Sequence, residues 1–152
     1  MVIPQKTSAY NTVLTSLRFE LTKTYEEAFI YKLVVDTLSK IPYFSWIGVY
    51  FFNPVTEEFY LGYYSGKLAK ITAIKLDQLR FTKFDVINDI NAERKFSVCP
   101  EVTSECKLLL TKNNTTLGLI AIGSENQNFF DEIDRKYLLE IAETVTDKVY
   151  HR

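Results

Sequence analysis

The sequence predicts an α+β domain in which a central antiparallel sheet carries the N- and C-terminal helices on one face and a ligand pocket on the other. Two observations predict it. Near both ends, apolar residues recur at spacings of three and four, which is typical of amphipathic helices. Between the ends lie short aromatic and β-branched runs joined by turn sequences, which is typical of hairpins. With 152 residues, the chain is expected to form one domain over 1–152.

The first two elements are expected to be helices. From Ala9 to Leu21, the apolar side chains share one helical face. A second helix is predicted to open at Thr24, where Glu27 three residues later completes a capping box, and to end at Pro42.

Two strands are predicted next, over Trp46–Phe52 and Phe59–Ser65, with a turn that begins at Asn53 and Pro54. In the first strand, the residues that point to one face and those that point to the other are all apolar or small. Both faces of this strand must therefore be covered. The two strands are expected to pair as an antiparallel hairpin.

The middle of the chain has weaker patterns. We expect an extended segment over Ile71–Leu76, a short helix over Phe84–Ala92 and a short strand over Phe96–Cys99, which ends before Pro100. These three elements are predicted to cover the face of the sheet that the terminal helices leave open.

A second hairpin and a long final helix complete the prediction. The strands Cys106–Thr111 and Thr116–Gly123 flank Asn113 and Asn114, which tolerate the positive φ angles of a type I′ turn. Asp131 is the expected N-cap of an amphipathic helix that runs almost to the chain end.

Composition excludes several classes of function. The net charge is −1, from 18 basic and 19 acidic residues, so no overall field favours nucleic acid or an acidic membrane. The sole histidine is His151, next to the last residue, which removes histidine-based nucleophile activation and imidazole metal sites. The five glycines form no phosphate-binding loop, so nucleotide hydrolysis lacks support.

No apolar run has the length of a signal peptide or a membrane span, so we expect a cytoplasmic protein. Cys99 and Cys106 are interpreted as buried thiols. The alternative is a thiol mechanism, although only Lys95 and Lys107 are near in sequence as cations that could lower a thiol pKa.

Two segments could build a small-ligand pocket. Gly48 lies between Trp46 and Tyr50 on one strand face. It marks either a bend in the strand or open space in a cavity wall that the two aromatic rings line. After the second strand, the backbone amides of Leu68 and Ala69 could converge on a small anion, or the segment could be an ordinary turn.

Three motifs resemble a GAF domain over roughly Tyr25–Tyr150: S-W-I-G-V-Y, T-L-G-L-I-A-I-G and F-F-D-E-I-D-R-K-Y-L. Among enzymes, the chain resembles free methionine-(R)-sulfoxide reductases. Those enzymes carry a G-V-C-G motif and an upstream catalytic cysteine, whereas Ile71–Phe96 contains neither cysteine nor glycine. The departure implies a protein that is not an enzyme, although Cys99 lies near the place of one family cysteine.

In length and pocket residues, the chain also resembles bacterial nitrate receptors of the NreA type, stand-alone GAF proteins that work with an oxygen-sensing histidine kinase. The resemblance implies that Trp46 lines a nitrate pocket, that Leu68 and Ala69 present backbone amides to nitrate, and that Phe96 and Val98 close the other side. It further implies a sensor that needs no cofactor and that modulates phosphorylation of the partner kinase.

Two alternatives stay open beside the nitrate sensor. One is a divergent thiol reductase that acts through Cys99 or Cys106, and the other is a GAF interaction module with an empty pocket. The amphipathic terminal helices are compatible with a homodimer.

Overall fold

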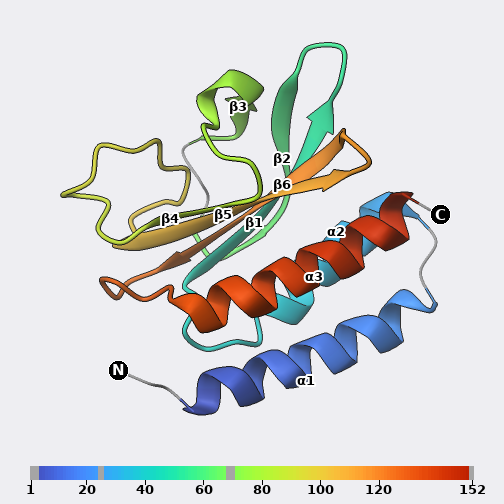
Figure 1. Cartoon of the computed structure of the whole chain (residues 1–152), viewed down its shortest axis with the longest axis horizontal. Helices are drawn as coiled ribbons and strands as arrows, with labels where there is room; N and C mark the ends of the chain where they lie inside the picture. The colour runs from blue at the N-terminus through green and yellow to red at the C-terminus, as the bar shows by residue number, and fades with distance from the viewer. Residues whose placement is uncertain (1–3, 24–25, 68–70, 151–152) are drawn as a thin grey trace.

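A six-stranded antiparallel sheet with helices on one face is the framework of the protein (Figure 1). The computed structural model describes residues 4–23, 26–67 and 71–150. The strand order across the sheet is β3-β2-β1-β6-β5-β4. The strands are β1 Trp46–Asn53, β2 Glu58–Ser65, β3 Ala73–Lys75, β4 Phe84–Ile87, β5 Ser104–Lys112 and β6 Thr115–Ser124, and a 3-10 turn covers Leu76–Gln78.

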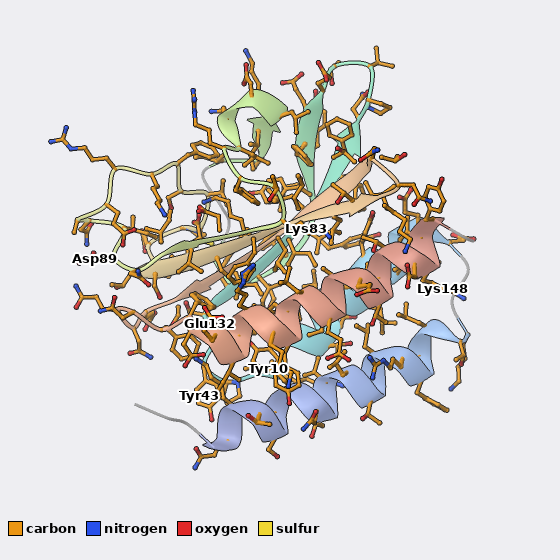
Figure 2. The ribbon with its side chains drawn as sticks, viewed as in Figure 1. Tyr10, Tyr43, Lys83, Asp89, Glu132 and Lys148 are labelled. Carbon is orange, nitrogen blue, oxygen red and sulfur yellow. The ribbon has the colours of Figure 1, made fainter. Side chains whose placement is uncertain are left out.

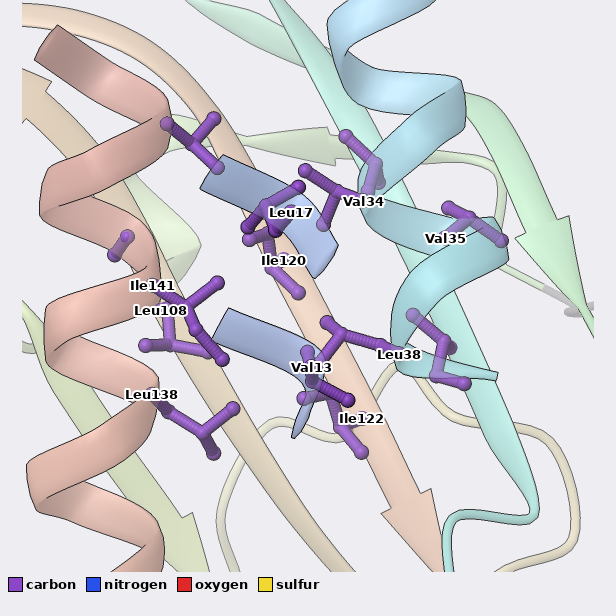
Figure 3. Close-up of a cluster of buried hydrophobic side chains, with 14 of the residues drawn as sticks. Val13, Leu17, Val34, Val35, Leu38, Leu108, Ile120, Ile122, Leu138 and Ile141 are labelled. Carbon is purple, nitrogen blue, oxygen red and sulfur yellow. The ribbon is translucent and has the colours of Figure 1, made fainter. Parts of the chain in front are cut away.

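Three helices cover one face of this sheet in two layers (Figure 1). The helices α2 (Glu27–Leu38) and α3 (Glu132–Tyr150) pack on the strands, and α1 (Pro4–Leu21) packs on both of these helices. The side chains of Val13 and Leu17 reach from α1 into the cluster that holds Ile120 and Ile122 of the sheet (Figure 3). No helix within the described ranges is long and apolar enough to cross a membrane.

The sheet separates two hydrophobic clusters because successive side chains of a strand point to opposite faces. On β1, Ile47 and Val49 belong to the cluster under the helices, whereas Trp46 and Tyr50 belong to a cluster on the other face. We call the second one the outer cluster. Its buried members are Trp46, Tyr50, Phe59, Ile74, Val98, Leu119 and Ala121.

The predicted α+β fold, both hairpins and the terminal helices are confirmed. Asn113 and Asn114 have φ angles of 50° and 61°, as the predicted turn requires. Asp131 caps α3, because its Oδ1 accepts hydrogen bonds from the amides of Ile133 (3.0 Å) and Asp134 (3.3 Å). The capping box expected at Thr24 lies outside the described residues.

Two predictions for the middle of the chain are wrong. The segment predicted as a helix over Phe84–Ala92 instead begins with strand β4, which pairs with β5 at the sheet edge through Phe84 and Leu108. The strand predicted over Phe96–Cys99 is irregular, because the amides of Val98 and Cys99 donate to a side-chain carboxylate rather than to a neighbouring strand. The extended segment within Ile71–Leu76 is confirmed as β3.

Gly48 gives space to a protein side chain rather than to a ligand. A Cβ atom at this position would lie 2.1 Å from Cη2 of the Trp46 indole, whose six-membered ring covers the glycine. The expectation that Gly48 leaves open space between Trp46 and Tyr50 is therefore wrong on this face of β1. The indole itself fills the gap and tightens the outer cluster.

Replacement of Gly48 by alanine is expected to lower the free energy of unfolding by about 1–3 kcal/mol, because the indole must leave its position. Urea unfolding measures the loss. In the Trp46→Phe background, where the clashing part of the indole is absent, the same replacement should cost less. Equal losses in the two backgrounds would show that the contact with Trp46 is not the cause.

Candidate functional site

The candidate site is the outer cluster together with residues 88–103, which connect β4 to β5 and which we call the covering segment. Val98 is buried in this cluster, and Phe96 and Cys99 pack against it. Gly123 of β6 lets the covering segment approach, since a Cβ there would lie 2.7 Å from Val102 Cγ1 and 3.2 Å from Cys99 Cβ. The covering segment is therefore seated directly on the sheet.

Glu105 holds the covering segment in place. This carboxylate on β5 is fully buried, and its Oε1 accepts hydrogen bonds from Ser97 Oγ (2.9 Å), the Val98 amide (2.9 Å) and the Cys99 amide (2.7 Å). Three donors on one carboxylate oxygen fix the backbone beside the thiol.

Lys107, two residues further along β5, is the cation that balances Glu105. Its side chain is 2% exposed, and its Nζ lies 2.5 Å from Glu105 Oε2 and 3.8 Å from Asp85 Oδ2. A buried carboxylate without a cation would be strongly disfavoured, so each member of the pair depends on the other. The pair places two opposite charges under a cover of apolar side chains.

Trp46 brings an unused hydrogen-bond donor to the same cluster. Its side chain is buried, and its indole Nε1 has no hydrogen-bond partner within the part of the chain that the structure describes. Nearby, Tyr50 is satisfied, because its hydroxyl donates to the carbonyl oxygen of Ile71 at 2.8 Å. A buried donor without an acceptor is rare in proteins and indicates a place where a ligand atom would be favourable.

Cys99 is a free, partly exposed thiol at this site. Burial of the sulfur raises the pKa of Cys99 well above its ordinary value, and the Glu105 carboxylate raises it further by its charge and by a hydrogen bond. Lys107 acts in the opposite direction but does not reverse the shift. The resting side chain is therefore a protonated thiol at neutral pH, with the Glu105 carboxylate beside it.

The rate of Cys99 alkylation by iodoacetamide should rise about tenfold per pH unit between pH 6 and pH 8, because only the thiolate reacts. Mass spectrometry of the modified peptide measures this rate, and the variant Cys99→Ser identifies any background from the other cysteine. A rate that is already constant from pH 6 would mean that the thiol pKa is lowered rather than raised.

Cys106 lies on the opposite side of the sheet. It is fully buried in the cluster under the helices, and burial followed by the charge of Asp134 raises the pKa of its thiol. Successive side chains of a strand point to opposite faces of the sheet. Because Glu105 points to the outer face, Cys106 points to the face under the helices. The interpretation of a buried thiol is therefore confirmed for Cys106, while Cys99 stands at the candidate site.

The predicted pocket residues come together in part. Trp46, Val98 and Phe96 share the outer cluster, as the resemblance implied, although the structure does not test their contact with nitrate. Leu68 and Ala69, the predicted amide donors, lie outside the described residues.

Glu105 was not predicted as a functional residue, and Lys107 was predicted only as a neighbouring cation. Their alternation with Cys106 gave a signal, since Glu105 directly precedes the strand predicted over Cys106–Thr111 and would share one face with Lys107 if that strand began earlier. That pattern alone is typical of a solvated strand face, and only the covering segment makes it a buried pair.

Comparison with known proteins gives clear matches in sequence and in structure. Protein YtsP of Bacillus subtilis (strain 168) is 30% identical over 111 residues, which cover 69% of this chain and 68% of YtsP. A free methionine-R-sulfoxide reductase from Neisseria meningitidis, solved with its substrate, has a TM-score of 0.86 at 21% identity and covers 97% of this chain and 92% of its own. No protein-family model matches the chain.

Two further solved structures have the same fold. The reductase fRMsr of Staphylococcus aureus in its reduced form has a TM-score of 0.78 at 16% identity, over 91% of this chain and 94% of that one. A putative GAF sensor protein from Burkholderia vietnamiensis has a TM-score of 0.81 at 18% identity, over 94% of each chain.

The antiparallel sheet, the helices on one face, the covered outer cluster and these neighbours show that the protein has a GAF fold. More particularly, the chain belongs to the same family as protein YtsP of Bacillus subtilis. The predicted GAF fold is confirmed. The matches do not support the narrower resemblance to nitrate receptors.

The expectation that the protein is not an enzyme is contradicted. Solved structures that match almost the whole chain include free methionine-R-sulfoxide reductases from two bacteria, which are enzymes built on this fold. That expectation rested on the absence of cysteine and glycine from Ile71–Phe96. Cys99 lies outside that range, and the fold brings it to the outer face of the sheet.

Proposed function

We propose that the protein is a thiol-dependent reductase that acts on a small free sulfoxide of the methionine sulfoxide type, with Cys99 as the nucleophile. The position of Cys99 carries this proposal. The thiol lies on the outer face, with its backbone fixed by Glu105, and the similar enzymes of known structure reduce free methionine-R-sulfoxide.

The reaction transfers one oxygen atom from substrate to protein. The Cys99 sulfur attacks the sulfoxide sulfur, its proton passes to the sulfoxide oxygen, and the oxygen moves to Cys99 as the sulfur–oxygen bond of the substrate breaks. The products are a thioether and a sulfenic acid at Cys99. The substrate sulfur gains two electrons, and the Cys99 sulfur loses two.

Glu105 is placed to assist this step. Because its carboxylate raises the pKa of Cys99, the attack must begin from a protonated thiol, and the carboxylate is the acceptor within hydrogen-bond reach. Lys107 balances the negative charge of this buried carboxylate, since its ammonium group lies 2.5 Å from Glu105 Oε2. Glu105 would hold the proton and return it to the oxygen that leaves the substrate.

Regeneration of the thiol requires an external dithiol or two monothiols. Cys106 lies in the cluster under the helices, on the opposite face of the sheet from Cys99. The sulfenic acid is therefore reduced by two thiol groups from outside, which yield water and a disulfide of the reductant. The separation of the two cysteines predicts that turnover requires Cys99 but not Cys106.

The test is methionine formation from racemic free methionine sulfoxide, with dithiothreitol as the reductant and separation of the two epimers by chromatography. We expect consumption of one epimer, complete loss of turnover in Cys99→Ser and turnover within about twofold of wild type in Cys106→Ala. Absence of methionine with the wild type, or equal activity in Cys99→Ser, would overturn the proposal.

A second candidate is a receptor for nitrate that modulates phosphorylation of a sensor histidine kinase. The buried indole Nε1 of Trp46 favours it, because this unpartnered donor could meet one oxygen of a small anion among apolar walls. A ligand of four heavy atoms is limited to about −6 kcal/mol, which is a Kd on the order of tens of micromolar.

Isothermal titration with nitrate tests this candidate separately from turnover. Saturable binding that Trp46→Phe abolishes would support a receptor, with phosphorylation of the kinase as the following measurement. If nitrate does not bind while sulfoxide turnover is observed, the receptor is excluded and the reductase proposal remains.

A further inference from the structure

A pocket opens at the β4–β5 edge of the sheet, beyond the buried ion pair of Glu105 and Lys107. It encloses about 260 Å³, and its lining comes from the turn after β3, from β4, from the covering segment and from β5. Cys99 and Trp46 are not among its lining residues. The pocket therefore adjoins the candidate site for the thiol reaction and shares Phe96 and Lys107 with it, but it does not contain the thiol.

Positive charge dominates this pocket. Arg80, Arg94, Lys95 and Lys107 line it, against one carboxylate, that of Asp85. Lys107 is the buried member and lies at the bottom, whereas Arg80 and Arg94 are exposed and lie at the mouth. A concave site with cations at both its bottom and its mouth concentrates the field on an anion.

Two of the four cations are already balanced. Lys107 pairs with Glu105 at 2.5 Å, and Lys95 lies 3.5 Å from Asp85 Oδ1 and donates to the Val86 carbonyl oxygen at 3.0 Å. The guanidinium groups of Arg80 and Arg94 have no ion pair with any residue in the described ranges. The pocket cations without an ion pair in these ranges are therefore both arginines, the side chain that binds carboxylate and phosphate in a bidentate manner.

Two phenyl rings complete the pocket. Phe81 and Phe96 both line it, and each is only partly buried in the protein. An inorganic ion would leave these rings in contact with water, whereas a flat organic group would cover them. The volume of the pocket is at the lower end of the range for small-molecule sites, so the ligand must be small.

We infer that this pocket binds a small organic dianion, a phosphate monoester or a dicarboxylate, whose charged group is held by Arg80 and Arg94 and whose organic part contacts Phe81 and Phe96. Two negative charges match the two unbalanced guanidinium groups. This inference does not rest on the proposed reductase activity, because no atom of Cys99 takes part.

Phenyl phosphate is the probe, measured by isothermal titration at fixed ionic strength. We expect saturable binding to one site with a Kd in the micromolar to low-millimolar range. Arg94→Gln should weaken binding at least tenfold, because one of the two guanidinium groups is lost. Phenol should not bind, and inorganic phosphate should bind more weakly than phenyl phosphate because it cannot cover the rings.

Lys83→Gln is the matched control. It removes the same charge from an exposed residue near β4 that does not line this pocket (Figure 2). Its Kd should stay within about twofold of wild type, and so should that of Cys99→Ser. Equal weakening by Arg94→Gln and Lys83→Gln, or phenyl phosphate binding that never saturates, would overturn the inference, since both indicate attraction by surface charge alone.

Discussion

Glu105→Ala should lower the free energy of unfolding by about 3–5 kcal/mol, one of the two largest effects that we expect from a single substitution. The substitution leaves the ammonium group of Lys107 buried with only the more distant Asp85 at 3.8 Å. It also removes the acceptor of three hydrogen bonds from residues 97–99. Urea unfolding followed by fluorescence of Trp46 measures the loss.

Two further variants separate the charge from the hydrogen bonds. Glu105→Gln keeps an amide oxygen as acceptor and should cost less than Glu105→Ala. The double variant Glu105→Ala with Lys107→Met removes both charges of this pair, so its loss should be smaller than the sum of the single losses. Additive losses, or a loss below about 1 kcal/mol for Glu105→Ala, would show that the pair is not coupled.

Lys6→Met should have an effect of similar size at the other end of the molecule, where α1 meets α3. Lys6 Nζ lies 2.5 Å from Asp134 Oδ2 and donates to the Phe129 carbonyl oxygen at 2.7 Å, and both charged side chains are buried. Tyr10, which lies between the two helices (Figure 2), donates to Asp134 Oδ1 at 2.5 Å. Loss of the ammonium group leaves a buried carboxylate without its cation.

We expect Lys6→Met to lower the free energy of unfolding by about 3–5 kcal/mol at pH 7 and to increase amide exchange along α1. Burial already raises the pKa of Asp134 against the opposing effect of Lys6. Without Lys6 this pKa should rise further, so protonation relieves the unpaired charge and the loss should shrink as the pH falls.

Arg18→Met is the control for this prediction. Arg18 also joins α1 to α3 through an ion pair, with Glu140 at 2.8 Å, but both side chains are about half exposed. Its removal should cost less than about 1 kcal/mol because water screens the pair. Similar losses for the two variants would contradict the importance of burial at Lys6.

Local sequence patterns predicted most of the framework. The apolar stripes of α1 and α3, the turn at Asn113 and Asn114 and the cap at Asp131 depend on residues close together in the chain. The helix predicted over Phe84–Ala92 failed because β4 exists only through its pairing with β5, about twenty residues away.

The candidate site was less predictable than the framework. Trp46 was predicted from the strand pattern around Gly48 and Phe96 and Val98 from a resemblance, and the structure brings all three into one cluster. Glu105 was missed because an isolated glutamate in a strand is typical of a solvated face. Its importance depends on the covering segment, whose backbone amides need an acceptor that no strand supplies.

By itself, the sequence determined that this protein has an α+β fold with a central sheet, terminal helices on one face and a covered second face, because the periods of 3.6 and 2 residues are local properties. Only the tertiary structure decided which of the two cysteines meets the outer face and which charges are buried. Those properties depend on strand register and on the segment that lies over the sheet, and neither is encoded by neighbouring residues alone.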